Sequence, residues 1–180
     1  MKRSVIAILI GVVCAASLQV LAVSQKSELK FTVPTGWVEE TRTSSMRVAQ
    51  YKLPKAAGDA EDASLVVYYF GQGQGGSTAA NVERWVGQIK QADGSAVKDA
   101  KQEQFETNGL KLTTVDVSGT YVAETAPGSG TFHNNAGYRL RAAVVETPNG
   151  NYFVKLVGPE KTVAQWNESF LNYLKSFQLK

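Results

Sequence analysis

The chain has 180 residues, with 19 Lys and Arg, 16 Asp and Glu, one His and a formal net charge of +3 at pH 7. This length suits one domain with a sizeable core, and the small charge without a basic aromatic cluster argues against a nucleic-acid partner. The single cysteine excludes an internal disulfide and a thiolate metal site.

The first 22 residues have the three-part pattern of a secretory signal peptide. Lys2 and Arg3 precede an apolar run over residues 5–16, and the small residue Ala22 ends the segment. The pattern predicts a signal peptide over 1–22 and one mature domain over 23–180, placed in the periplasm or secreted. Without Lys2 and Arg3, the 19 basic residues fall to 17 against 16 acidic ones.

Two alternatives for this segment stay open. A permanent anchor is disfavoured because Ser17 and Gln19 interrupt the run, which is shorter than the roughly 20 apolar residues of a membrane span. A lipid on Cys14 is disfavoured because Gly11 and Val13 before it are a poor lipoprotein signal. We expect membrane contact only if the segment is uncleaved or lipidated.

The mature chain begins with strand patterns. Alternating apolar residues predict a strand over 29–33, which the proline and glycine of 34–36 end in a turn, and Trp37 should fold back onto the core. A second strand is predicted over 46–53, followed by a polar loop over 55–63. The next strand, 64–70 (SLVVYYF), is continuously apolar and should be central and buried on both faces.

A helix follows a glycine-rich segment. Val82, Trp85, Val86 and Ile89 have the spacing of one helical stripe within 78–91, and Ser77 or Thr78 is the expected N-cap.

The second half of the chain predicts long strands and a closing helix. Strands are expected over 98–106 and 110–122 around an Asn108-Gly109 turn, and over 138–145 and 152–157 around the turn 147–150. Residues 119–137 form a Gly- and Pro-containing loop, and apolar residues from 163 to 177 predict a helix covering a sheet face. One α+β domain follows, with an antiparallel sheet flanked by helices.

Several segments carry a resemblance to a known superfamily. The segment FTVPTGW (31–37), the hairpin at 108–109, and NYFVKLVGP followed by VAQWNESFLNYLKSF resemble the PsbP-like superfamily. This resemblance implies an α/β/α sandwich, and its characterised members act as binding or scaffold proteins. The segments YYFGQGQGGSTAANVERWVGQ and VVETPNGNYFVKLVGPEKTVAQW resemble a family of uncharacterised exported bacterial proteins, which implies no specific activity.

The glycine-rich segment before the helix is one candidate contact site. Gly71, Gly73, Gly75 and Gly76 could present backbone amides to an anion or a peptide at the helix N-terminus. No Gly-Lys-Ser/Thr ends the segment and its spacing is not the dinucleotide pattern, which argues against a nucleotide. A plain backbone turn is the alternative.

The loop over 119–137 is the second candidate. His133, Asn134 and Asn135 lie in it and could contact a ligand or partner. One histidine lacks the nucleophile and orienting group of a catalytic set and the further ligands of a zinc site, so we expect no catalytic residue, no metal and no cofactor.

The sequence therefore predicts an exported, non-enzymatic binding or accessory protein of the cell envelope. Its partner would be another envelope protein or a small anionic ligand. Two alternatives stay open. One is a carboxylate-dependent hydrolase assembled from distant acidic residues with 119–137 as a lid. The other is a structural envelope component.

Overall fold

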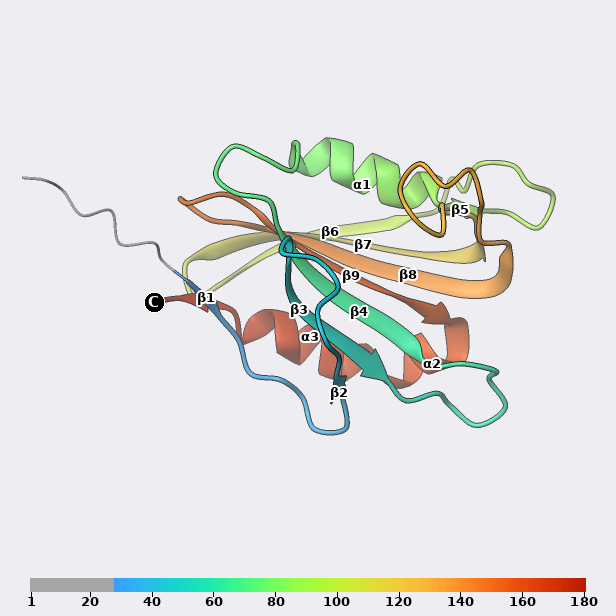
Figure 1. Ribbon diagram of the computed structural model, residues 1–180, viewed down its shortest axis with the longest axis horizontal. Helices are drawn as coiled ribbons and strands as arrows, with labels where there is room; N and C mark the ends of the chain where they lie inside the picture. The colour runs from blue at the N-terminus through green and yellow to red at the C-terminus, as the bar shows by residue number, and fades with distance from the viewer. Residues whose placement is uncertain (1–27) are drawn as a thin grey trace, which may run out of the picture.

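The computed structural model describes residues 28–180, which form an α+β fold in three layers. Helix α1 covers one face of the main sheet, and α2 and α3 lie on the opposite face (Figure 1). The predicted signal peptide, with Cys14, lies outside the described residues. No helix within residues 28–180 has the length and apolar character needed to span a membrane.

Ten strands and three helices make up the fold. In chain order they are β1 (Leu29–Lys30), β2 (Val38–Glu39), β3 (Arg47–Leu53), β4 (Ala63–Tyr69), α1 (Thr78–Gly87), β5 (Ile89–Lys90), β6 (Lys101–Thr107), β7 (Leu110–Tyr121), β8 (Asn135–Glu146), β9 (Tyr152–Pro159), α2 (Glu160–Gln165), α3 (Asn167–Lys175) and β10 (Gln178–Leu179). The main sheet is antiparallel with the order β2-β3-β4-β9-β8-β7-β5, and β6 also pairs with β7. Strands β1 and β10 form a separate pair.

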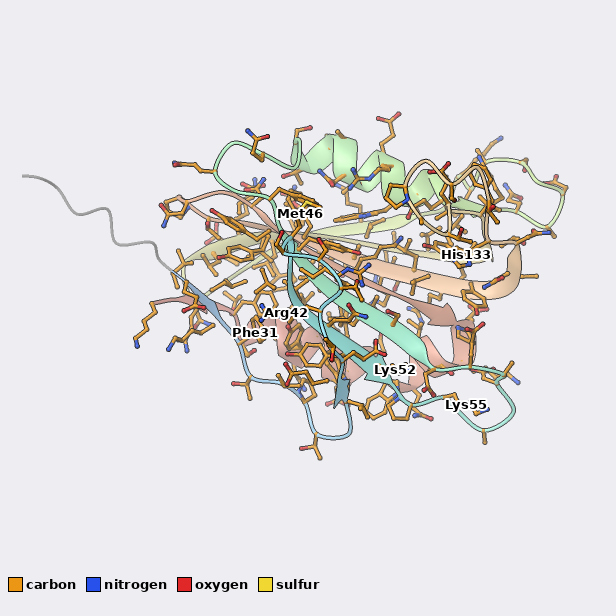
Figure 2. The ribbon with its side chains drawn as sticks, viewed as in Figure 1. Phe31, Arg42, Met46, Lys52, Lys55 and His133 are labelled. Atoms are coloured by element: carbon orange, nitrogen blue, oxygen red, sulfur yellow. The ribbon has the colours of Figure 1, made fainter. Side chains whose placement is uncertain are left out.

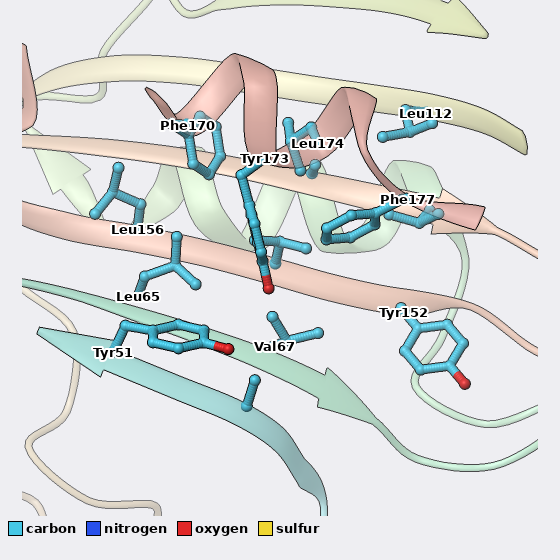
Figure 3. Packing of buried hydrophobic residues seen from close by; sticks show 14 of the residues in the cluster. Tyr51, Leu65, Val67, Leu112, Tyr152, Leu156, Phe170, Tyr173, Leu174 and Phe177 are labelled. Carbon is cyan, nitrogen blue, oxygen red and sulfur yellow. The ribbon is translucent and has the colours of Figure 1, made fainter. Parts of the chain in front are cut away.

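The larger core lies between the sheet and α3. Phe170, Tyr173, Leu174 and Phe177 point from α3 and its C-terminal end onto the strands and are fully buried (Figure 3). Trp37 is also buried here, with its ring centroid 5.0 Å from that of Tyr173. The prediction that Trp37 returns to the core and that the last apolar stripe covers a sheet face is confirmed.

A smaller core lies under α1. Val82 and Trp85 of the helix pack against apolar residues of β7 and β8, including Val115 and Leu140. The side chain of Ser77 caps the helix by accepting a hydrogen bond from the amide of Ala80 at 3.2 Å, as predicted. Because α1 is only ten residues long, it leaves part of this sheet face uncovered.

Three predicted elements differ in the structure. The strand predicted over 29–33 is paired only at 29–30, where it joins β10. The amide of Thr32 donates a hydrogen bond to the Ser176 hydroxyl and not to a neighbouring strand. The helix over 78–91 ends at Gly87, because Ile89 pairs with Tyr121 in the sheet. The closing helix is divided at Trp166, whose indole nitrogen donates to the Pro54 carbonyl at 2.8 Å.

The prediction that β4 is buried on both faces is confirmed at its centre, where Val66 and Val67 are both buried, but not toward its ends. Its side chains toward α3, including Leu65 and Val67, are fully buried. On the opposite face Ser64 and Tyr68 are only half-buried, because α1 does not extend over them. This uncovered area of the sheet forms the floor of a groove.

Candidate functional site

The groove has a volume of about 1200 Å³ and lies on the face of the sheet that carries α1. Its floor is formed by β4 and β9, and its walls by the C-terminal part of α1, the segment 43–47 and the loop 122–134. Met46 and His133 lie well apart along it (Figure 2). The side chains that line it include Met46, Arg47, Glu61, Asp62, Tyr68, Phe70, Arg84, Gln88, Tyr121, Glu124, Phe132, His133, Tyr138 and Lys155.

Lys155 places a cation on the floor of the groove. It extends from β9, between Val66 of β4 and Ala142 of β8 in the strand pairing. Its ammonium donates to the Gln88 side-chain oxygen at 2.7 Å and to the Tyr121 hydroxyl at 2.9 Å. Burial, followed by repulsion from Arg84, lowers the pKa of Lys155 from 10.5 to about 8. The protein thus holds this charge without an ionic partner among residues 28–180.

Tyr121 reaches Lys155 because the end of β7 is distorted. The register between β7 and β8 shifts between Gly119 and Tyr121. A Cβ at Gly119 would lie 2.4 Å from the Lys90 carbonyl oxygen, so only glycine permits this close approach of β5. Burial, with a smaller contribution from Tyr68, raises the pKa of Tyr121 to about 12, so its hydroxyl stays protonated near neutral pH.

Two arginines add further positive charge to the groove. Arg47 donates to the Gln50 side-chain oxygen at 2.6 Å, and Arg84 donates to that of Asn81. In the described part of the chain neither arginine forms an ion pair. All three groove cations are therefore bonded to neutral oxygen atoms only.

The groove carboxylates bond to other groups. Glu61 accepts a hydrogen bond from the Tyr138 hydroxyl, and burial followed by this bond raises the pKa of Tyr138 to about 12. Asp62 accepts from the Lys55 amide at 2.9 Å, and Glu124 accepts from the Gly128 amide at 2.9 Å. These contacts fix the surrounding loops and leave the cations unneutralised.

Aromatic rings lie on both sides of Lys155. On β4, the rings of Tyr68 and Phe70 are nearly parallel, with an interplanar angle of 4° and centroids 5.9 Å apart. Across the groove, the Tyr121 and Tyr138 rings meet at 7° with centroids 6.2 Å apart, and the His133 ring lies 5.2 Å from that of Tyr121. The ammonium of Lys155 thus lies between two pairs of stacked aromatic rings.

The structure separates the predicted contact residues into two groups. His133 and Asn135 line the groove, and Asn134 lies between them in the chain without lining it. Gly71, Gly73, Gly75 and Gly76 lie in the loop before α1, at the opposite end of this helix from the loop 122–134 (Figure 1). The fold does not bring the two loops together.

The glycine loop has a clear packing role. A Cβ at Gly75 would lie 2.5 Å from the Phe153 ring. The Tyr69 hydroxyl at the end of β4 donates to the Asn149 carbonyl at 2.6 Å, which holds the loop beside the turn 147–150. These contacts account for a glycine at Gly75 without a ligand.

The groove residues that sequence reasoning missed are Lys155, Gln88 and Tyr121. One signal for Lys155 was present: it is the only charged residue in the apolar strand YFVKLVGP. Charged side chains are rarely buried without a reason, so a lone lysine in a central strand indicates a site or an internal ion pair. Gln88 and Tyr121 carry no such signal.

Comparisons with known proteins give little further information. No protein-family model and no curated protein matches the chain. Among solved structures, the chain is similar to a protein of unknown function from Pseudomonas aeruginosa, with 12% identity, a TM-score of 0.46 and coverage of 86% of this chain and 85% of that one. Within residues 28–180, no group of three or more His, Asp or Glu side chains is placed to hold a metal ion.

Proposed function

We propose that this chain is an exported, non-enzymatic binding protein of the cell envelope, and that its groove takes an organic anion. The observation that carries the proposal is the ammonium of Lys155, which lies on the groove floor with two neutral hydrogen-bond partners. Holding a buried cation away from a carboxylate is unfavourable for folding, and an anionic ligand would offset that cost.

The charge distribution supports an anion in preference to a cation or a neutral ligand. Arg47 and Arg84 line the same groove as Lys155, while Glu61, Asp62 and Glu124 of the lining accept hydrogen bonds from neutral groups of the protein. The lining thus carries three cations and three carboxylates, so the preference for an anion rests on the position of Lys155 on the groove floor and not on net charge. The signal peptide that the sequence predicts over residues 1–22 supports the envelope location.

We further propose that the fold is the PsbP-like α/β/α sandwich. The order of the elements supports this assignment. The turn 34–36 precedes the buried Trp37, β6 and β7 form the hairpin at 108–109, and α3 closes the fold over the sheet. As a fold assignment it carries no activity of its own.

Isothermal titration calorimetry tests the function. The purified chain is titrated with a panel of organic carboxylates, sulfonates and phosphates, alongside Lys155→Met and the matched control Lys161→Met, which removes an exposed lysine on α2 across the sheet. We expect at least one anion to bind to the wild type and to Lys161→Met, with affinity lost in Lys155→Met. The proposal is wrong if no anion binds, or if binding survives in Lys155→Met.

A further inference from the structure

The head of the groove ligand can be specified from the hydrogen-bond donors around Lys155. An ammonium has three N–H groups, and two of these reach Gln88 and Tyr121, so the third is free for a ligand. The Tyr121 hydroxyl accepts from Lys155, which leaves its own proton to donate. Two free donors on neighbouring atoms 2.9 Å apart fit the two oxygens of one carboxylate.

The same donors discriminate between head groups. The Gln88 oxygen, an acceptor beside them, is already bonded to Lys155. A carboxamide would place an N–H group against a donor and lose a hydrogen bond. A phosphate dianion carries a second charge, which the single ammonium of Lys155 would not neutralise.

The body of the ligand is indicated by the aromatic surface on β4. Lys155 pairs with Val66 across the sheet, and Tyr68 follows two residues later on the same face. The Tyr68 and Phe70 ring centroids are 5.9 Å apart, which is too close to admit a third ring, since a sandwich needs about 7 Å from two carbon contacts of 3.5 Å. A ligand ring would therefore pack against the outside of this pair, near the Arg47 guanidinium, whose carbon lies 5.7 Å from the Tyr68 ring centroid.

The rim of the groove gives independent support for an apolar ligand body. The large apolar side chains that are exposed among the described residues are Val33, Val38, Met46, Phe70 and Phe132. Three of these, Met46, Phe70 and Phe132, border this one groove. Gathering of exposed apolar side chains around a concave surface marks a binding site.

We propose that the ligand is an aryl carboxylate, with its carboxylate on Lys155 and Tyr121 and its ring packed against the stacked pair of Tyr68 and Phe70. This inference rests on the proposed function, because it names the class of anion that the groove takes. The parallel rings of Tyr68 and Phe70 favour a rigid flat body over a flexible aliphatic chain, which loses more conformational entropy on binding.

The test uses three probes that differ in one property each. Titration calorimetry compares 2-naphthoate with 2-naphthamide, which lacks the charge, and with decanoate, which keeps the carboxylate but lacks the rings. We expect both to bind at least about tenfold more weakly than 2-naphthoate. Phe70→Leu, at a partly exposed position, should weaken 2-naphthoate severalfold and leave decanoate unchanged, while far-UV circular dichroism confirms that it folds.

The possible outcomes separate this inference from the proposed function. Equal or tighter binding of decanoate that depends on Lys155 overturns the aryl class but keeps the anion-binding function. Another outcome is that inorganic phosphate binds through Lys155 and 2-naphthoate does not. That result likewise overturns the aryl class and keeps the anion-binding function. Equal binding of 2-naphthamide shows that the carboxylate head is wrong. Binding of no anion through Lys155 overturns both proposals.

Discussion

The ammonium of Lys155 and the hydroxyl of Tyr121 lie 2.9 Å apart, although the two residues are 34 positions apart in the chain. They come from β9 and β7, on either side of β8. The ammonium also lies 4.9 Å from the Tyr121 ring centroid, so the aromatic face partly stabilises the charge. This contact replaces the carboxylate that a buried lysine usually has, and it leaves the charge available to a ligand.

Lys155→Met should make the protein more stable while removing anion binding. The folded state lowers the pKa of Lys155 from 10.5 to about 8, which means that folding disfavours the charged form. The unfavourable contribution is fully present below about pH 8 and disappears as the pH rises toward 10.5. We expect a gain of about 2 kcal/mol in the free energy of unfolding at pH 7.

Urea unfolding of both proteins at pH 7 and at pH 10 measures this effect. The gain should shrink at the higher pH, where the wild-type lysine is mostly neutral in the folded state. Lys161→Met should show no gain at either pH. If Lys155→Met is less stable than the wild type at pH 7, the packing and hydrogen bonds of Lys155 stabilise the fold by more than the burial of its charge destabilises it.

Affinity for a carboxylate should fall as the pH rises through about 8. Only the protonated form of Lys155 attracts the anion, and its pKa in the free protein is about 8. Affinity should therefore decrease about tenfold per pH unit above that value, until the higher pKa of the complex is reached. Tyr121 and Tyr138 do not interfere, because their pKa values are about 12.

Calorimetry with 2-naphthoate between pH 7 and pH 10 measures this decrease. Lys155→Arg provides the control, because a guanidinium keeps its proton over the whole range. If Lys155→Arg binds and its affinity is flat, the titrating group is Lys155. An equal decrease in Lys155→Arg would assign the pH dependence to another group.

Gly119→Ala should destabilise the fold and weaken ligand binding together. The added Cβ would meet the Lys90 carbonyl oxygen at 2.4 Å and the Ile89 side chain at 2.7 Å, so β5 or the end of β7 must move. We expect a loss of about 2 kcal/mol or more in unfolding free energy. Since Tyr121 lies two residues further along β7, beyond the register shift, its contact with Lys155 should also be lost.

Gly94→Ala is the matched control for this substitution. Gly94 also has a positive φ, of 82°, but no atom lies within 4 Å of a Cβ placed there. Its cost should be limited to backbone strain of about 1 kcal/mol, with binding unchanged. Equal effects of the two variants on binding would contradict the positioning of Tyr121 by Gly119.

The strands and turns of the long hairpins could be predicted because their signals are local. Asn108 and Gly109 both have positive φ, of 49° and 74°, as their turn requires. The missed features depend on distant contacts. The pairing of Ile89 with Tyr121 and the bond from Trp166 to the Pro54 carbonyl join segments that no local pattern connects.

The groove could not be predicted because it depends on what α1 fails to cover. The apolar run that contains Val66 and Tyr68 has the composition of a strand buried on both faces, and the sequence does not say that the helix ends short of β4. The sequence pointed to the loop 119–137, whose His133 and Asn135 line the groove, but glycine richness also suggested the segment 71–76. Glycine is required where the backbone packs closely, as it does here between Gly75 and the Phe153 ring, as well as where it binds a ligand.

Trp37→Ala should destabilise the fold without changing the ligand site. The Trp37 side chain is 8% exposed and packs against Tyr51 and Tyr173, on the sheet face opposite the groove. Truncating it removes a large buried ring, and we expect a loss of about 3 to 5 kcal/mol in unfolding free energy by urea denaturation. Val38→Ala, at a neighbouring side chain that is 53% exposed, should cost almost nothing.

At a temperature where Trp37→Ala remains folded, its affinity for 2-naphthoate should equal that of the wild type, because no groove residue is altered. Lost binding in a variant of unchanged stability would instead place Trp37 in a contact site.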